Sequence, residues 1–65
     1  MSPETKFLQA GRFSGDKDFK NCNEWVRKNA KVIEVRDVQL RTDHNGQDFV
    51  LLFYGINKED MEKLE

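Results

Sequence analysis

A polar segment, Asp43–Asp48, separates two runs of strand-forming residues and limits the possible folds more than any other part of the sequence. The run before it, Val32–Thr42, is rich in β-branched and aliphatic residues, and the run after it, Phe49–Ile56, is apolar at nearly every position. An Asn-Gly pair between two such runs favours a type I′ hairpin, because both residues tolerate a positive φ. We therefore predict an antiparallel hairpin with a two-residue loop at Asn45-Gly46.

A two-residue loop fixes which residues of the two strands face each other. Leu40 is predicted to lie opposite Leu51 and Val38 opposite Phe53, and we expect this face to be the core beneath a helix. The opposite face then mixes polar with apolar side chains and stays open in a single chain. Contiguous exposed apolar surface usually marks an interaction site, so we predict an interface there, formed by Gln39, Arg41, Val50, Leu52 and Tyr54.

The run before the turn alternates imperfectly. Ile33 and Val35 have odd numbers, whereas Val38 and Leu40 have even numbers. Since a shift of one residue moves every side chain of a strand to the other face, the two halves cannot share one face without an irregularity. We predict a β-bulge at Arg36-Asp37.

A helix pattern precedes the hairpin, from Lys17 to Asn29. Apolar residues recur there at spacings of three and four, which makes one apolar stripe. Asp16 is predicted to cap the first turn, and Asn29 to end the helix in a left-handed conformation. The residues of the stripe are Phe19, Cys22, Trp25, Val26 and Ala30.

The remaining segments complete a β-α-β-β order. Residues 1–5 are predicted to be an irregular start, Lys6–Ala10 a first strand that extends as far as Phe13, and Asn57 the cap of a short last helix. A right-handed helical crossover makes the first two strands parallel, and the last strand lies between them. We predict an α+β fold, a split β-α-β unit with a three-stranded sheet, one main helix on one face and a short C-terminal helix, as a single domain over residues 1–65.

The short length of the chain suggests that it is stabilised by self-association. A chain of 65 residues buries only about 60% of the surface that its unfolded form exposes, and its core rarely supplies more than about 3–5 kcal/mol. One cysteine, Cys22, forms no disulfide within the chain, and one Cys with one His falls short of the four ligands of a structural zinc. We therefore expect a homo-oligomer, a dimer or higher, joined through the sheet.

No motif for catalysis, metal or cofactor binding is found. Cys22 lies on the apolar stripe and His44 in the predicted turn, so the nucleophile and the only imidazole base are separated. His44 and its flanking aspartates have neither the length nor the spacing of a calcium loop. Gly11–Gly15 lacks the signatures of phosphate-binding loops. We expect no catalytic residue, no metal, no cofactor and no enzymatic activity.

Charge and hydropathy restrict the partners. The formal net charge is −1 and the pI about 5.8, whereas nucleic-acid-binding domains are typically basic. Nucleic-acid binding is therefore the alternative function rather than the leading one. The chain starts without an apolar leader and holds no apolar run of membrane-spanning length, so we expect a cytoplasmic protein. The basic residues that could line one sheet face are Lys6, Arg12, Arg36 and Arg41.

The order of elements resembles that of the dodecins, small β-α-β-β flavin-storage proteins. In that family a tryptophan on the second strand stacks on the flavin. Here the only tryptophan, Trp25, falls in the predicted helix, and Val32–Thr42 has no aromatic residue. The resemblance therefore implies the topology without flavin binding.

Three segments also resemble a family of roughly 60-residue sporulation proteins of spore-forming bacteria, over residues 6–55. The segments are Asn23-Glu24-Trp25, the strand Ile33–Leu40 with its Ile-x-Val-x-Asp spacing, and Val50–Tyr54. The resemblance implies a fold and a bacterial or phage origin, and it brings no functional residues. We expect a non-enzymatic accessory protein that self-associates through its sheet.

Overall fold

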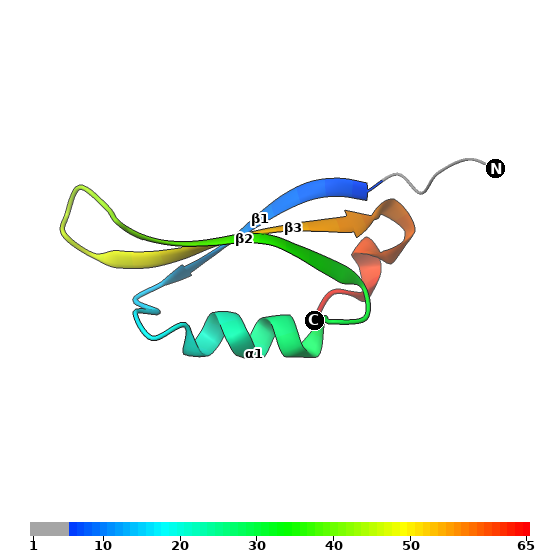
Figure 1. Cartoon of the computed structure of the whole chain (residues 1–65), viewed down its shortest axis with the longest axis horizontal. Helices are drawn as coiled ribbons and strands as arrows, with labels where there is room; N and C mark the ends of the chain where they lie inside the picture. The colour runs from blue at the N-terminus through cyan, green and yellow to red at the C-terminus, as the bar shows by residue number, and fades with distance from the viewer. Residues whose placement is uncertain (1–5) are drawn as a thin grey trace.

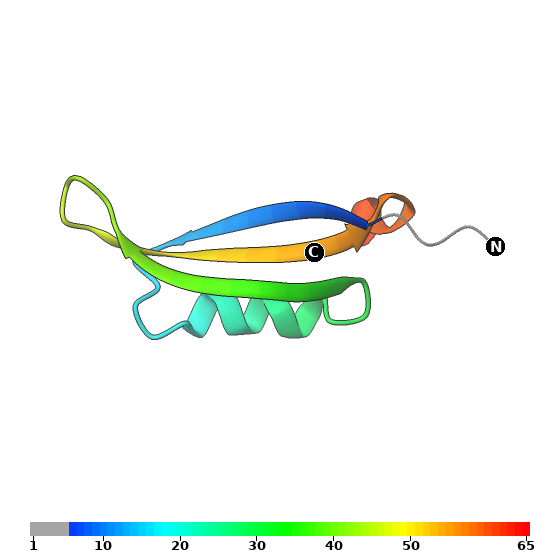
Figure 2. The same ribbon diagram turned by 45° about the horizontal axis from the view of Figure 1, so that its top comes forward.

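The chain forms a three-stranded sheet with one helix on one side (Figure 1). The computed structural model describes residues 6–65, and the predicted irregular start at residues 1–5 lies outside this range. The strand order is β1-β3-β2, and both outer strands run antiparallel to β3, as Figure 2 shows. The predicted fold class, element order and central last strand are confirmed. The elements are β1 (Lys6–Ser14), α1 (Lys20–Lys28), β2 (Ile33–Thr42), β3 (Asp48–Asn57) and η1, a 3-10 helix (Lys58–Lys63).

The turn between β2 and β3 is closed by a hydrogen bond between Asp43 and Gln47, which encloses three residues, 44–46, rather than the predicted two. The Asp43 N–H donates to the Gln47 carbonyl at 2.9 Å, and the Gly46 N–H donates to the Asp43 carbonyl at 3.0 Å. The Asp43 carboxylate accepts from the N–H groups of Asn45 and Gln47, both at 2.9 Å. Gly46 alone in this loop has a positive φ, 81°. The predicted type I′ turn is therefore wrong: Asp43 stabilises a wider loop that needs only one left-handed residue.

The longer loop shifts the register by one residue, which turns every side chain of β3 to the other face. Val38 pairs with Leu52 and Leu40 with Val50, so the predicted pairs with Phe53 and Leu51 are wrong. Three residues predicted to lie on the open face are instead buried beneath α1: Val50, Leu52 and Tyr54. The premise that they would be exposed in a single chain is thus corrected.

The predicted bulge in β2 is confirmed. The register shifts between Val35 and Asp37, so Val35 pairs with Tyr54 while Val38 pairs with Leu52. Both halves of β2 therefore direct their aliphatic side chains toward the α1 side of the sheet. Those side chains belong to Ile33, Val35, Val38 and Leu40.

Helix α1 begins later than predicted, at Lys20, because Phe19 before it has a left-handed conformation with φ 62°. The buried Asp16 carboxylate nevertheless serves the first turn. Its two oxygens accept from the N–H groups of Asn21 and Cys22, each at 2.8 Å. These bonds satisfy amides that a helix start leaves without partners and stabilise the negative charge at the positive end of the helix.

Asn29 joins the end of α1 to the C-terminal segment. Its φ of −110° is not left-handed, so that part of the prediction is wrong. Its side chain donates to the Trp25 carbonyl at 2.9 Å and accepts from the Glu65 N–H at 2.8 Å. Leu64 packs against the core. The C-terminal segment therefore closes the α1 side of the sheet and does not cover the open face (Figure 1).

The core lies between β3 and α1. Its buried apolar members are Cys22, Val50, Leu52, Tyr54 and Ile56. The Trp25 ring packs between the rings of Tyr54, at a centroid distance of 5.1 Å, and Phe13 on β1, at 6.3 Å. These contacts place the tryptophan over β3 and β1.

Candidate interaction surfaces

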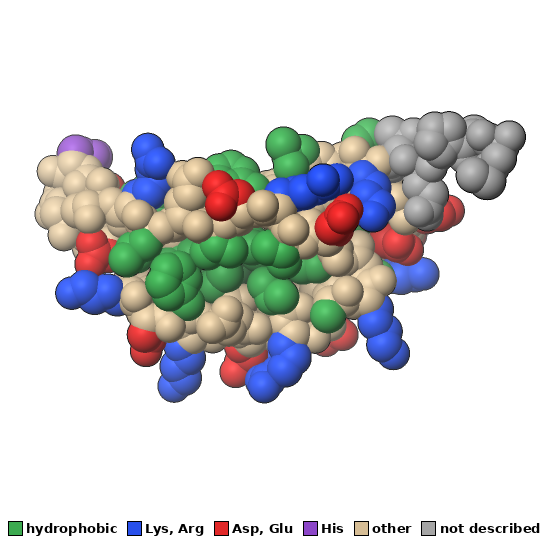
Figure 3. Space-filling model, in the orientation of Figure 1, with side chains coloured by type: hydrophobic (Ala, Val, Ile, Leu, Met, Phe, Trp, Pro, Cys, Tyr) green, Lys and Arg blue, Asp and Glu red, His purple; other side chains and the backbone are tan. Residues whose placement is uncertain are grey.

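The α1 side of β2 is left largely uncovered. Val35, Val38 and Leu40 are 44%, 38% and 47% exposed, although they face the same side as the buried β3 residues. We name these three residues the β2 strip. Figure 3 shows hydrophobic side chains gathered between the sheet and α1 on the face that β2 presents to the viewer. The strip is therefore an exposed apolar surface next to the core, at the edge of the sheet that α1 does not cover.

The sequence-based prediction placed part of this strip beneath the helix. The side was correct, because Val38 and Leu40 do face α1, but the coverage was wrong. A helix is about 10 Å wide, and strands lie about 4.8 Å apart, so one helix covers roughly two of three strands. The single helical pattern in the sequence was the available sign that one outer strand would remain uncovered.

The backbone of β2 is also unpaired on one side. Because the Asp43 N–H bonds to the Gln47 carbonyl, odd-numbered residues of β2 after the bulge direct their backbone groups toward β3. Val38 and Leu40 therefore direct theirs away from the sheet. The Val38 N–H donates to the carboxylate of its neighbour Asp37 at 2.9 Å. An edge strand with such groups is a template for pairing with another strand.

A row of polar side chains follows β2 on the open face, the side of the sheet away from α1. The Arg41 guanidinium donates to the side-chain amide oxygen of Gln39 at 2.8 Å, and the Gln39 side-chain nitrogen donates to the Asp37 carboxylate at 2.9 Å. Of the five predicted interface residues, Gln39 and Arg41 thus lie on the open side of the edge strand. The other three lie on the opposite side of the sheet, where they are buried. The row displays a positive charge at one end and a negative charge at the other.

The centre of the open face is a half-buried apolar row on β3, formed by Phe49, Leu51 and Phe53. The Arg12 guanidinium lies 4.0 Å from the centroid of the Phe49 ring, in a cation–π contact. It also lies 3.7 Å from the Asp43 carboxylate. The register places the predicted basic residues Arg12 and Arg41 on this face, on strands β1 and β2.

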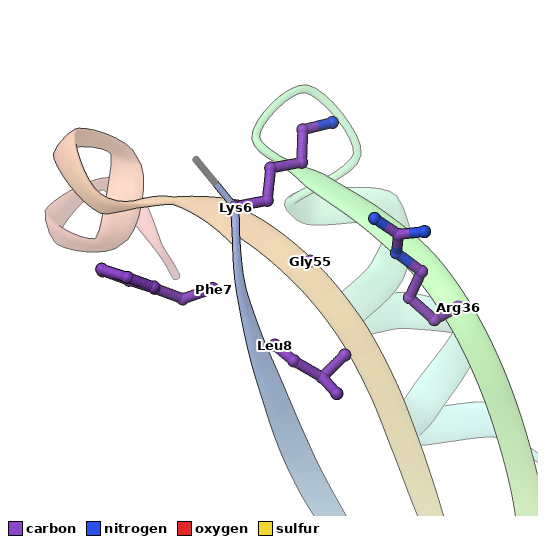
Figure 4. A pocket seen from close by; sticks show the side chains of 5 residues that line it. All are labelled: Lys6, Phe7, Leu8, Arg36 and Gly55. Carbon is purple, nitrogen blue, oxygen red and sulfur yellow. The ribbon is translucent and has the colours of Figure 1, made fainter. Parts of the chain in front are cut away.

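A charged cluster occupies the other end of the open face. Figure 4 shows Lys6 and Arg36 extending over Gly55 from the two outer strands. Both cations lie near one oxygen of Glu34, at 3.1 and 3.3 Å. The hydrogen bond from Lys6, and next the charge of Arg36, lower the pKa of Glu34. The shallow pocket here, about 400 Å³, is lined by Lys6, Phe7, Leu8, Arg36 and Gly55.

The residues able to carry chemistry are not brought together. Cys22 is buried on α1, and burial, followed by the charge of Asp16, raises the pKa of its thiol. His44 is exposed in the loop between β2 and β3, which extends away from α1 (Figure 1). Within residues 6–65, no group of three or more His, Cys, Asp or Glu side chains could hold a metal ion.

Comparison of the chain with protein-family models, with curated proteins and with solved structures gives no match. The likeness to the dodecins is therefore one of element order alone. No helix within residues 6–65 has the length and apolar character needed to cross a membrane.

Proposed function

We propose that this chain is a non-enzymatic interaction module that self-associates through its sheet. The observation that carries the proposal is the exposure of the β2 strip, Val35, Val38 and Leu40, beside an unpaired strand edge. Exposed apolar side chains and an edge that no strand of the chain pairs both favour the same kind of partner, a second strand with its own apolar side. A second copy of the chain supplies both.

The magnitudes indicate a modest affinity. Fully burying a Val or Leu side chain gains about 1.5–3 kcal/mol, and the strip side chains are already about half covered, so each gains roughly 1 kcal/mol on association. Two copies bring six such side chains, which amounts to on the order of 6 kcal/mol. Association costs about 4–15 kcal/mol, so burial alone yields little. Backbone hydrogen bonds along the edge must add to it, and we expect a dissociation constant in the micromolar range or weaker.

Sedimentation velocity over a concentration series tests the proposal. We expect the sedimentation coefficient to rise with concentration toward that of two chains between about 1 µM and 1 mM. A mass of one chain across the whole range contradicts the proposal. A Leu40→Glu variant is the matched control, because it places a charge in the β2 strip at a residue that is already half exposed, and it should remain a single chain.

The expected setting follows the resemblance in sequence. We propose a cytoplasmic accessory protein of a bacterium or phage, related to the small sporulation proteins. The basis is the resemblance of Asn23-Glu24-Trp25, Ile33–Leu40 and Val50–Tyr54 to segments of that family. Expression confined to sporulating cells would support this relation, and constant expression in growing cells of a host without spores would contradict it.

Nucleic-acid binding is a second candidate, and the open face favours it. Phe49 and Phe53 lie on the central strand, with Arg12 and Arg41 on the two outer strands. Sheets of this kind stack single-stranded bases on aromatic rings and bind phosphates through basic side chains. Asp37 lies opposite Phe53 and weakens this electrostatic attraction. Binding of a single-stranded RNA that weakens steeply with salt and is lost in Phe53→Ala would support it.

A further inference from the structure

We propose that two copies pair through their β2 strands, antiparallel about a two-fold axis at Gln39, so that Arg41 of each copy faces Asp37 of the other. This inference rests on the proposed self-association, and it adds the strand, the register and the charges that select the partner. It follows from the alternation of β2, from its polar row and from the position of the β2 strip.

Symmetry limits how two edges can pair. A two-fold axis that makes two neighbouring strands antiparallel must stand perpendicular to the sheet, and it therefore keeps each face on its own side. Residues that face each other across the axis must then point to the same face. Both α1 helices lie on the same side of the resulting six-stranded sheet, and Val38 and Leu40 of the two copies meet in the space between the helices.

The register centred on Gln39 matches every pair along the straight part of β2. Val38 of one copy faces Leu40 of the other, so exposed apolar side chains meet on the α1 side. Arg41 faces Asp37 on the open side, so opposite charges meet twice, once on each side of the axis. Gln39 faces Gln39, and its amide can both donate and accept. Cross-strand pairs of opposite charge and of apolar side chains both favour sheet pairing.

Neighbouring registers lack this complementarity. Centring the pair on Val38 sets Leu40 against Arg36, at the bulge, and leaves the apolar side chain beside a charge. Centring it on Leu40 sets Asp37 against Asp43, which brings like charges together twice. Centring it on Asp37 places two carboxylates at the axis. Like charges directly opposite each other destabilise a sheet pair.

The backbone also suits the register centred on Gln39. Val38 and Leu40 direct their N–H and C=O groups away from β3, so each such pair across the axis can exchange two hydrogen bonds. The Val38 N–H is occupied in the single chain by the Asp37 carboxylate, at 2.9 Å. When Asp37 turns to the partner's Arg41, that N–H becomes free to bond across the edge. Asp37 thus covers the edge in the single chain and binds the partner in the pair.

A charge exchange tests the register. Asp37→Arg and Arg41→Asp each replace two attractive pairs by two repulsive ones, and each should weaken dimerisation at least about tenfold. The double variant restores opposite charges in exchanged positions and should recover most of the affinity. Glu62→Arg, the same change in charge at an exposed residue of η1, is the control and should leave the affinity unchanged. Circular dichroism verifies that each variant is folded.

A cysteine at the axis provides a second test that does not depend on charge. The two copies of residue 39 form a non-hydrogen-bonded pair, whose Cα atoms lie about 4.5 Å apart, within the range that a disulfide spans. Gln39→Cys with an added oxidant should give a covalent dimer, whereas Gln47→Cys in the loop should not. A wild-type protein that stays a single chain overturns the proposed function and this inference together. A wild-type dimer that is insensitive to charge reversal and fails to cross-link at residue 39 overturns the register alone.

Discussion

Strands β2 and β3 form one hairpin and pair along their length, yet they bury their α1-facing side chains to very different extents. On β3 these side chains are buried, whereas Val35, Val38 and Leu40 at facing positions of β2 are 38–47% exposed. Both strands are rich in aliphatic residues, so hydrophobicity does not explain the difference. The position of each strand explains it. Strand β3 has a strand on each side and is covered by α1, whereas β2 lies at the edge of the sheet, and one helix is too narrow to cover it as well.

The difference has a consequence for what each strand can do. The β3 side chains stabilise the single chain, and the β2 strip is available to a partner. Substitutions in β3 should therefore lower the free energy of unfolding, and substitutions in β2 should mainly lower the affinity between chains.

The largest contrast is between two leucines on neighbouring strands. Leu52→Ala removes a fully buried side chain from the core, at a cost of about 2–5 kcal/mol, which is comparable to the whole stability of so small a domain. Leu40→Ala removes a half-exposed one and should cost about 1 kcal/mol or less in the single chain. Urea unfolding at a concentration below association measures both. If the two variants lost equal amounts of unfolding free energy, α1 would have to cover Leu40 as fully as it covers Leu52, contrary to the structure.

The next largest effect concerns how α1 is held over β3 and β1. Asp16→Ala removes a buried carboxylate that accepts from two N–H groups of the first turn, and it should cost about 2 kcal/mol. Asp18→Ala is the matched control, because Asp18 is exposed and makes a longer contact, 3.3 Å, to the Lys20 N–H. Urea unfolding of the two variants compares them. A control as destabilised as Asp16→Ala would contradict this account of the cap.

A smaller effect concerns the loop that decides which side of β3 is buried. Asp43→Ala removes the carboxylate that accepts from Asn45 and Gln47, and it should destabilise the hairpin by about 1 kcal/mol. Asn45→Ala keeps both bonds, since they use its backbone, and should change the unfolding midpoint little. If Asn45→Ala proved the more damaging substitution, a two-residue turn at Asn45-Gly46 would be the better description.

This loop also explains why the register could not be predicted from the sequence. On β3, both the even set that starts at Val50 and the odd set that starts at Phe49 are apolar, so alternation did not distinguish the two faces. Asn45-Gly46 is the usual sign of a two-residue turn, and the Asp43 carboxylate overrides it with two hydrogen bonds. The distinguishing sign was Gly55, which interrupts the odd set, whereas Ile56 continues the even one.

The order of elements and the bulge were more accessible to prediction. Local alternation reveals the bulge, because the parity of the aliphatic residues changes between Val35 and Val38. The crossover rule determines the direction of the strands once the helix is recognised. The extent to which α1 covers the sheet depends on distances between layers, and single-sequence patterns do not contain them. For that reason Val50, Leu52 and Tyr54 were expected on the open face with Gln39 and Arg41, whereas they are buried on the α1 side.

The smallest predicted effect concerns Glu34, which lies on the open face near the start of β2. The hydrogen bond from Lys6 and the charge of Arg36 lower the pKa of Glu34, so the ionised form is favoured in the folded chain. Its contribution is present at neutral pH and is lost as the pH falls below the ordinary Glu value toward the lowered pKa. Glu34 is exposed, and exposed pairs contribute little. Glu34→Gln should therefore lower the urea midpoint slightly at pH 7 and not at all at pH 2.

Amide hydrogen exchange at Leu40, followed by NMR as the protein concentration is raised, is the decisive test of pairing through β2. The Leu40 N–H points away from β3 in the single chain and should exchange rapidly in dilute solution. At high concentration it should slow markedly, because it then donates to Val38 of the second copy. The Gln39 N–H, which faces β3, should be protected throughout and serves as the internal reference. Rapid exchange at Leu40 that is independent of concentration would contradict pairing through β2.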